Sequence, residues 1–373
     1  MDPDIDISQL PPPARKAIAP DTPLPLKMMA AKGVLPGVKP ADVITVVVIL
    51  GQSDSEEIAQ TARATLKNIP KSMLDAALGN QLVAPVLSAL VEQFYEKPEV
   101  VEKLLRQSLI TGSSLEFLAE HATERIGELI ATNEQQMLAN PRVIEKLYMN
   151  KRVRMSTADR LIELAVRNHI ELGIPAFKEA AAAIKFELIP EPTPEPTYDD
   201  DLFKDTERVA KEIGADSIED DTHEVDEEGA EILKNQFIPL YQQIARMTVT
   251  QKIRRAMLGT AAERLLLIRD SNRLVSAAAA KSPLLRENEA VLISSSRSVS
   301  DDVLRIIAMN REFTRSYQIK YNLVVNPRTP FSFAARLIPH LRDSDLKSLM
   351  KSKNVGSSVI QAIHQQLDRK KKN

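Results

Sequence analysis

Short apolar segments alternate with polar–proline pairs along most of this chain, and each segment has the length of one short helix. In the stretch LVVNPRTPFSFAARLI, residues 323–338, an apolar run ends at Asn326-Pro327 and the next run begins directly after Pro330. Proline is tolerated in the first turn of a helix, where its missing N–H leaves no hydrogen bond unmade. Each such pair therefore predicts the end of one helix and the start of the next.

The same pattern returns at a fixed distance. Residues 97–105 (KPEVVEKLL) align with residues 140–148 (NPRVIEKLY) at an offset of 43, and Ser282-Pro283 aligns with Asn326-Pro327 at an offset of 44. Such a period is typical of α-solenoids, in which each unit buries its apolar face only against its neighbours. A non-repetitive helical bundle is the alternative. The stacking further predicts that four leucines are buried: Leu104, Leu147, Leu304 and Leu337.

The most apolar run is VITVVVIL, residues 43–50. Its β-branched residues suit a strand as well as a helix, and the helical surroundings favour a buried helix. The run is too short to cross a bilayer as a helix. We therefore expect an all-α fold with little β-structure.

Composition narrows the kind of core and the kind of chemistry. Apolar residues make up 43% of the 373 residues, whereas aromatic residues make up 4% and Trp is absent. The core must therefore be aliphatic, which suits helices packed on helices. The absence of cysteine excludes disulfides, thiolate catalysis and cysteine-bearing zinc sites. Asp2, Asp4 and Asp6 stand where a secretory signal would carry basic residues, so we expect a cytoplasmic location.

Charge is divided unevenly along the chain, although the formal net charge is only −2. Residues 186–234 hold 4 basic and 18 acidic side chains, a net charge of −14, and residues 235–373 hold 24 basic and 10 acidic side chains, a net charge of +14. Composition and charge therefore predict four segments. These are a Pro-rich flexible segment (1–40), an N-terminal helical repeat domain (41–189), an acidic Pro-rich linker (190–232) and a basic C-terminal helical repeat domain (233–373).

Two of these segments are predicted to be flexible. The acidic linker opens with prolines at alternate positions and has few apolar residues to offset the entropy cost of folding. We expect it to be disordered, with a short helix around residues 202–213. Residues 1–40 contain nine prolines and no aromatic residue. We expect a flexible segment there, with a short docking helix near residues 26–31.

The Asn-Pro-Arg-Thr-Pro sequence of residues 326–330, with a helical segment on either side, resembles the repeats of bacterial HEAT-like and leucine-rich-repeat-variant α-solenoids. The stretch 253–275, continued through residues 340–349, is similar to an uncharacterised group of such proteins from deltaproteobacteria, including myxobacteria. The resemblance covers residues 235–368 well and residues 41–185 more loosely; Ser282-Pro283 departs from the pattern because it lacks the Asn. It implies a repeat architecture and no particular activity.

Motifs for catalysis are missing from the sequence. No nucleotide-binding glycine loop, zinc-protease motif or esterase motif occurs. The five histidines are scattered without the paired spacing of metal ligands: His121, His169, His223, His340 and His364. We therefore expect no catalytic residue, no cofactor and no metal, and a protein that is not an enzyme.

One constellation in the basic half suggests an anionic partner. Phe313, Tyr317 and Tyr321 have the spacing of one helix face. Basic residues interleaved with aromatic residues can bind phosphates and stack on bases. The alternative is that the aromatic side chains are core and the cations form the solvated face. The candidate surface consists of Arg311, Arg315, Lys320, Arg328 and Arg336.

The leading functional hypothesis is a non-enzymatic protein-interaction scaffold or regulatory adaptor, because a helical repeat offers a long rigid surface to a protein partner. The alternative is a nucleic-acid-binding protein that uses the basic C-terminal half, and an anionic membrane surface is also compatible with its charge. At low ionic strength the acidic linker is expected to lie transiently across the candidate surface and to compete with an anionic partner. The alternative is a passive spacer whose acidity keeps it soluble and extended. The partner and the oligomeric state do not follow from the sequence.

Overall fold

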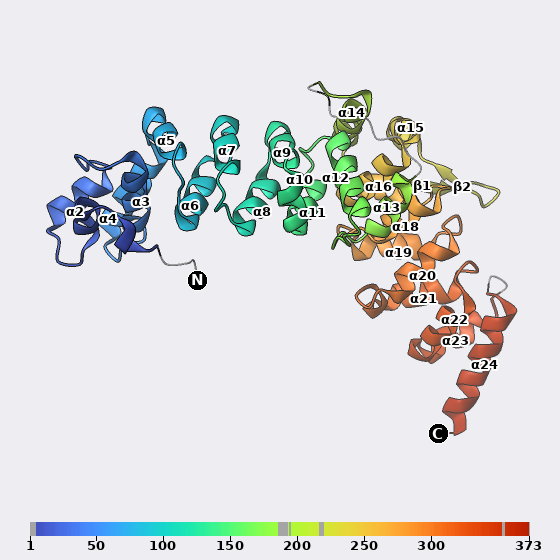
Figure 1. Cartoon of the computed structure of the whole chain (residues 1–373). Coiled ribbons are helices and arrows are strands. Elements are labelled where there is room, and N and C mark those ends of the chain that lie inside the picture. Colours follow the sequence, from blue (N-terminus) through green and yellow to red (C-terminus); the bar gives the residue numbers. More distant parts are fainter. Residues whose placement is uncertain (1–4, 186–192, 194, 216–219, 353–354, 373) are drawn as a thin grey trace. The chain divides into compact units, whose positions relative to one another are not determined.

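The computed structural model describes residues 5–185, 193, 195–215, 220–352 and 355–372, which form 24 α-helices and one two-stranded hairpin (Figure 1). The expectation of an all-α chain with little β-structure is confirmed. Contacts divide the chain into two compact units, residues 1–157 and 158–373. The division lies inside α12 (Met155–Arg167), whereas composition places a boundary near residue 190, so the four segments stay a prediction.

Unit 1 is built from short helices of 6 to 12 residues that precede α12. They are α1 (Pro12–Ile18), α2 (Leu24–Ala31), α3 (Pro40–Leu50), α4 (Glu56–Lys67), α5 (Lys71–Leu78), α6 (Ala84–Phe94), α7 (Pro98–Leu105), α8 (Gly112–His121), α9 (Glu124–Ala131), α10 (Glu134–Ala139) and α11 (Pro141–Met149). Helices two apart in the chain contact each other, as α3 contacts α5, α5 contacts α7, and α7 contacts α9.

Residues 43–50 belong to α3, so the helical interpretation of this β-branched run is confirmed. Six of its apolar side chains are buried: Val43, Ile44, Val46, Val47, Val48 and Leu50. The helix is covered by α1, α2, α4 and α5. Burial on nearly every side explains why the run shows no polar face in the sequence.

The described part of the N-terminal segment, residues 5–40, is folded, whereas the composition predicts a flexible chain. The docking helix near residues 26–31 is confirmed as α2, and a second helix, α1, precedes it. Ala14, Ala17, Ala30 and Ala31 are buried against α3 and α4. The prolines do not prevent this, because they lie in the first turns of both helices. Small alanine side chains allow close packing without aromatic residues.

Unit 2 contains the remaining helices and the hairpin. They are α13 (Phe177–Ile184), α14 (Tyr198–Glu212), β1 (His223–Val225), β2 (Glu231–Leu233), α15 (Ile238–Arg246), α16 (Val249–Leu258), α17 (Ala261–Leu267), α18 (Arg273–Ala280), α19 (Glu287–Ser295), α20 (Asp301–Met309), α21 (Tyr317–Val325), α22 (Phe331–Leu337), α23 (Asp343–Leu349) and α24 (Ser357–Lys372). Here too α16 contacts α18, α17 contacts α19, and α18 contacts α20.

The described part of the acidic segment is folded, which corrects the expectation of a disordered linker. The short helix expected around residues 202–213 is present as α14, and it is longer than predicted. Thr197 and Asp200 form a capping box at its start, and Leu202, Phe203 and Ala210 are buried. The antiparallel strands β1 and β2 follow. Acidic composition therefore hides an amphipathic helix whose apolar side chains share one face.

The pairing of helix ends with prolines is confirmed. Pro98 and Pro141, at the 43-residue offset, are the first residues of α7 and α11. The apolar run before Asn326 is α21, and the run after Pro330 is α22. All four leucines expected in the core are buried: Leu104, Leu147, Leu304 and Leu337.

Amide side chains cover the exposed carbonyl groups at several helix ends. After α21, the buried Asn326 donates to the carbonyls of Ser294 (2.9 Å) and Ser296 (2.7 Å), at the end of α19. Its Oδ1 accepts the N–H of Arg328 at 3.0 Å. The last carbonyls of a helix have no partner within the helix, so these bonds satisfy groups that burial would otherwise leave unpaired.

The same arrangement occurs twice in unit 1. Gln107, after α7, donates to the carbonyls of Leu78 and Asn80 at 2.9 and 3.0 Å. Asn150, after α11, donates to the carbonyls of Ala119 and Ala122 at 3.0 and 2.9 Å. The two amides are 43 residues apart, which equals the offset between residues 97–105 and 140–148 in the sequence.

Candidate functional site

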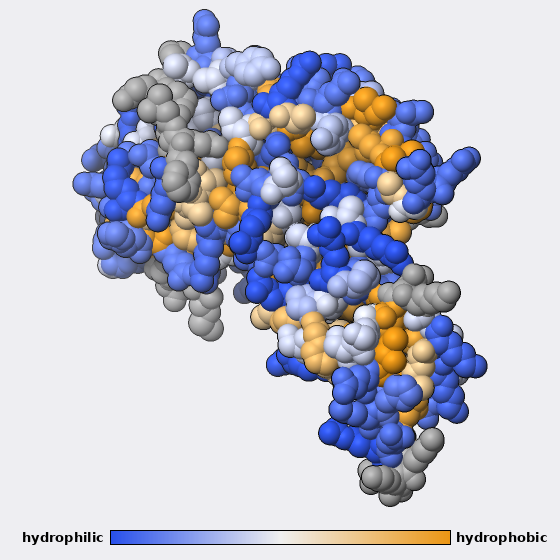
Figure 2. Space-filling view, turned by 90° about the vertical axis from the view of Figure 1, so that its right-hand side faces the viewer, coloured by the Kyte–Doolittle hydropathy of each residue, from blue (hydrophilic) through white to orange (hydrophobic). Residues whose placement is uncertain are grey.

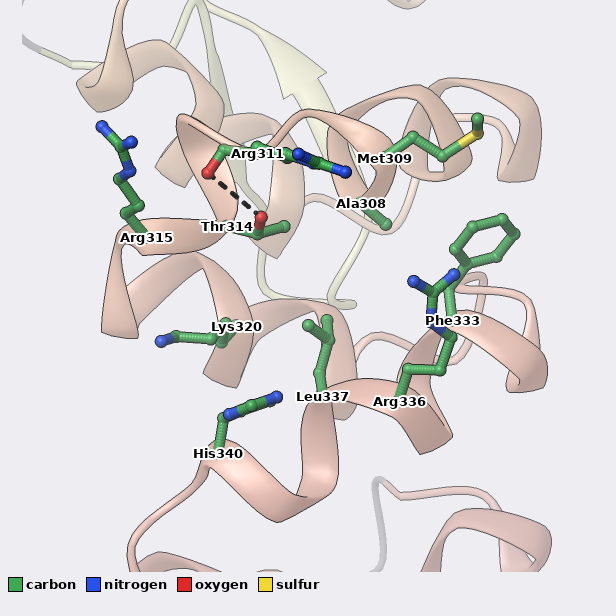
Figure 3. A pocket seen from close by; sticks show the side chains of 10 residues that line it. All are labelled: Ala308, Met309, Arg311, Thr314, Arg315, Lys320, Phe333, Arg336, Leu337 and His340. Carbon is green, nitrogen blue, oxygen red and sulfur yellow. Dashed lines mark hydrogen bonds between the residues drawn. The ribbon is translucent and has the colours of Figure 1, made fainter.

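A pocket of about 720 Å³ opens in unit 2 where the end of α20, the turn before α21, α21 itself and α22 meet. Figure 3 shows side chains from these elements directed toward a common space. No carboxylate is among the residues that line it: Ala308, Met309, Arg311, Thr314, Arg315, Lys320, Phe333, Arg336, Leu337 and His340.

Four of the five residues of the candidate surface line this pocket. They are Arg311, Arg315, Lys320 and Arg336, which come from three different elements. In Figure 3 the guanidinium groups of Arg311 and Arg336 approach the pocket from opposite walls, and Arg315 lies at its edge. Arg328 does not line the pocket, because it lies exposed on the turn that Asn326 holds after α21.

Most of the cations in this pocket have no acidic partner. Arg315 forms an exposed ion pair with Glu312 at 2.7 Å. Within the described ranges of the chain, no carboxylate lies within 4.0 Å of the charged groups of Arg311, Lys320 or Arg336. Unpaired cations around one concave space favour anion binding, since an incoming carboxylate or phosphate displaces only water.

The aromatic stripe expected over residues 313–321 is not one helix face, which corrects the sequence prediction. Phe313 lies in a short 3₁₀ turn (Phe313–Arg315) that ends at Ser316, and α21 begins only at Tyr317. The Tyr317 hydroxyl donates to Asp345 and accepts the N–H of Arg342 at 3.1 Å. Tyr317 therefore joins α21 to the start of α23, and the Arg342 guanidinium covers one face of its ring, 4.7 Å from the ring centre.

Apolar side chains that were not predicted from the sequence complete the pocket. Met309 is 65% exposed at the end of α20. Phe333 and Leu337 are four residues apart on α22 and lie beside Arg336. That spacing was a usable signal, since it places both side chains on one helix face. Nothing in the sequence shows that Met309, at the end of α20, lines the same pocket as Phe333 and Leu337 of α22.

A second pocket in unit 2, of about 500 Å³, has its charges already paired. It lies beside the hairpin, and its lining includes His223, Lys252 and Arg269. Lys252 pairs with Asp270 at 2.9 Å, and Arg269 pairs with Asp221 at 2.6 Å. Burial and the nearby charge of Arg269 lower the pKa of His223. This pocket therefore offers less to a charged ligand than the first.

Two carboxylates of the acidic segment form ion pairs with one arginine of unit 2. Arg269 binds both Asp221 and Glu231, at 2.6 and 3.2 Å. Phe203 of α14 lies against the guanidinium groups of Arg254 and Arg255, 5.2 and 4.8 Å from its ring centre. The described part of the segment thus contacts α16 and Arg269, which follows α17. That the segment lies transiently across the pocket stays a prediction.

Within the described residues, no group of three His, Cys, Asp or Glu side chains is arranged to hold a metal ion. None of the described helices combines the length and the apolar character that crossing a membrane requires. Comparison of the chain with protein-family models, curated proteins and solved structures found no match.

Proposed function

We propose that the chain is a non-enzymatic protein-interaction scaffold built from stacked helical repeats, and that the pocket of unit 2 binds an acidic segment of a protein partner. The repeat interpretation is supported by contacts between helices two apart, and by the amide bonds that recur at the 43-residue offset. Stacking of this kind produces the extended rigid surfaces on which repeat proteins bind their partners.

The observation that carries the choice of partner is the lining of the pocket. Unpaired Arg311, Lys320 and Arg336 stand beside the apolar side chains of Met309 and Phe333. An acidic peptide with an apolar side chain matches both features, because its carboxylates pair with the cations while the apolar group leaves water.

Nucleic acid fits the same lining less well. Binding a strand requires a continuous basic track and aromatic faces on which bases stack. Arg328 lies outside the pocket, Tyr317 is used within the fold, and Phe333 and His340 are the only ring side chains of the pocket lining. The Thr314 hydroxyl, the one alcohol in the lining, donates to the carbonyls of Asn310 and Arg311 at 2.9 and 3.3 Å. The hydroxyl is thus already engaged within its own turn, which supports a function of the pocket in ligand binding over one in catalysis.

The test uses fluorescence anisotropy of the full-length chain with two labelled probes: a peptide of alternating glutamate and valine, and a mixed-sequence single-stranded DNA of about 20 nucleotides. We expect the peptide to bind, and the double variant Arg311→Glu/Arg336→Glu to weaken it by about tenfold or more, because several charge contacts turn repulsive. The matched control, Arg328→Glu/Lys347→Glu, changes charge equally on exposed residues outside the pocket and should bind like the parent.

Tight DNA binding without peptide binding would favour the nucleic-acid function instead. Equal peptide affinity of the pocket variant and the parent would refute the pocket as the site.

A further inference from the structure

The hairpin of unit 2 ends in an acidic tip, defined here as residues 224–228. Its turn is well fixed, since the Asp226 carboxylate accepts the N–H groups of Glu228 and Ala230 at 3.0 and 2.8 Å. Gly229 has φ +84°, a conformation that glycine adopts without strain. The side chains of Glu224, Glu227 and Glu228 are exposed, and Val225 is 68% exposed. The tip therefore presents three carboxylates and one apolar side chain to solvent.

The base of the hairpin is held firmly, which keeps the tip projecting. Glu231, at the start of β2, accepts hydrogen bonds from Ser296 and Ser298 and from the N–H of Arg297, the last at 2.7 Å. Arg269 binds Glu231 and Asp221 across the same base. Figure 1 shows the two strands extending away from the helices of unit 2. The tip is thus a preformed projection, so docking it costs little ordering entropy.

The exposed surface of unit 2 gives this projection a suitable receptor. Figure 2 views the molecule from the side on which the hairpin lies in Figure 1, and hydrophilic side chains dominate it, with apolar groups in separate patches. The pocket combines unpaired Arg311, Lys320 and Arg336 with exposed Met309. Three carboxylates and one apolar side chain on the tip match three cations and an apolar wall in the pocket.

We infer that the acidic tip of one copy binds the cationic pocket of a second copy. This inference rests on the proposed function and names its partner. No hydrogen bond or ion pair between described residues joins the tip to the pocket of its own copy. Both sets of charges are therefore free to meet another molecule. Tip-to-tip and pocket-to-pocket contacts are disfavoured, because each would bring like charges together.

The geometry of such a contact determines the kind of assembly. Two different patches meet, so the contact is head-to-tail and each bound copy still presents one free tip and one free pocket. Association then continues with concentration instead of stopping at a dimer, unless a ring closes. A five-residue tip buries far less than the roughly 1,200 Å² of a stable interface. We therefore expect weak, salt-sensitive self-association that becomes significant only at high local concentration.

Charge-swap complementation in sedimentation velocity tests the inference with the full-length chain. The parent should show a sedimentation coefficient that rises with concentration up to about 100 µM, a range in which weak contacts become populated. The pocket variant, Arg311→Glu/Arg336→Glu, and the tip variant, Glu227→Lys/Glu228→Lys, should each stay monomeric. An equimolar mixture of the two should associate again, because each tip then meets a pocket of opposite charge. The control Arg328→Glu/Lys347→Glu should behave like the parent, and circular dichroism checks that all variants are folded.

The possible results separate this inference from the proposed function. A parent that stays monomeric over this range while its pocket binds the glutamate–valine peptide overturns self-association and leaves the acidic-partner function intact. Self-association that survives in both variants places the contact elsewhere and also overturns the inference. Failure of both peptide binding and self-association refutes the two together.

Discussion

Gln107, Asn150 and Asn326 each satisfy the carbonyl groups at the end of an earlier helix, and each does so from the position just after its own helix. An amide suits this place because its NH₂ group donates two hydrogen bonds while its oxygen accepts one. In Asn150 and Asn326 the oxygen accepts an N–H of the following turn, and in Gln107 it accepts the N–H of Leu82. The sequence shows these residues plainly, yet their role could not be derived from it. The acceptor carbonyls lie 27 to 32 residues away, and only the packing of helices brings them together.

Removing one of these amides should destabilise the fold measurably. Asn326→Ala leaves the buried carbonyls of Ser294 and Ser296 unpaired. We expect a loss of about 1–3 kcal/mol in the free energy of unfolding, because an unsatisfied buried group retains its desolvation cost. Chemical denaturation measures the change. Asn68→Ala is the control, since Asn68 is exposed and bonds only within its own helix end, and it should cost much less. Equal losses for the two variants would contradict the role assigned to Asn326.

Glu231 gives the hairpin base a pH dependence. Burial raises the pKa of this carboxyl, but hydrogen bonds from Ser298, Ser296 and the N–H of Arg297, with the charge of Arg269, lower it from 4.5 to about 2. Between these values the unfolded chain binds more protons than the folded chain, so the free energy of unfolding rises with pH. The stabilisation is fully present above pH 4.5 and is lost as the pH falls through 2.

Glu231→Gln should therefore be less stable than the parent near neutral pH, by about 1–2 kcal/mol once solvent screening at this partly exposed site is considered. The difference should shrink as the pH falls from about 5 toward 2. Urea denaturation at several pH values measures it. Glu228→Gln, on the exposed tip, serves as the control and should match the parent throughout. A Glu231→Gln difference that is constant with pH would show that the lost hydrogen bonds, and not the ionised carboxylate, account for it.

At the scale of elements, the sequence predicted best what depends on neighbouring residues. The proline-started helices α7 and α11 and the buried α3 followed from local spacing and composition. The break at Ser316 did not: Ser316 has an extended backbone between the 3₁₀ turn and α21, although the spacing of the aromatic residues suits a continuous helix. Order in the acidic segment was also missed. Its charge count suggested disorder, whereas Phe203 packs against the arginines of α16, more than 50 residues later in the chain.

At the scale of the whole molecule, the sequence shows how unevenly charge is divided along the chain, but not which residues the acidic side chains contact. Four of five candidate cations do line one pocket, since they are close in the sequence and short turns keep them together. Arg328 does not line the pocket, because the Asn326 side chain holds the turn that carries it. The acidic segment meets Arg269 and the helices around it, a contact that no local pattern encodes. The net charges predict that the acidic and basic segments attract each other, but only the folded structure shows which residues come into contact.

The attraction between these segments predicts how salt acts on the protein. Raising the ionic strength from about 0.1 M to 1 M shortens the Debye length from about 10 Å to 3 Å. The side chains of the Arg269–Asp221 pair are 7% and 20% exposed, so this pair weakens only modestly. Hydrogen exchange of backbone amides should therefore speed up in α14 and in the hairpin as salt increases. The amides of α3 provide the control, because this helix is covered by apolar side chains and should exchange at the same rate. Fast exchange in the acidic segment at both salt concentrations would instead support the prediction that this segment is a disordered linker. Slow exchange there that does not respond to salt would show that apolar contacts such as Phe203, and not charge, hold the segment in place.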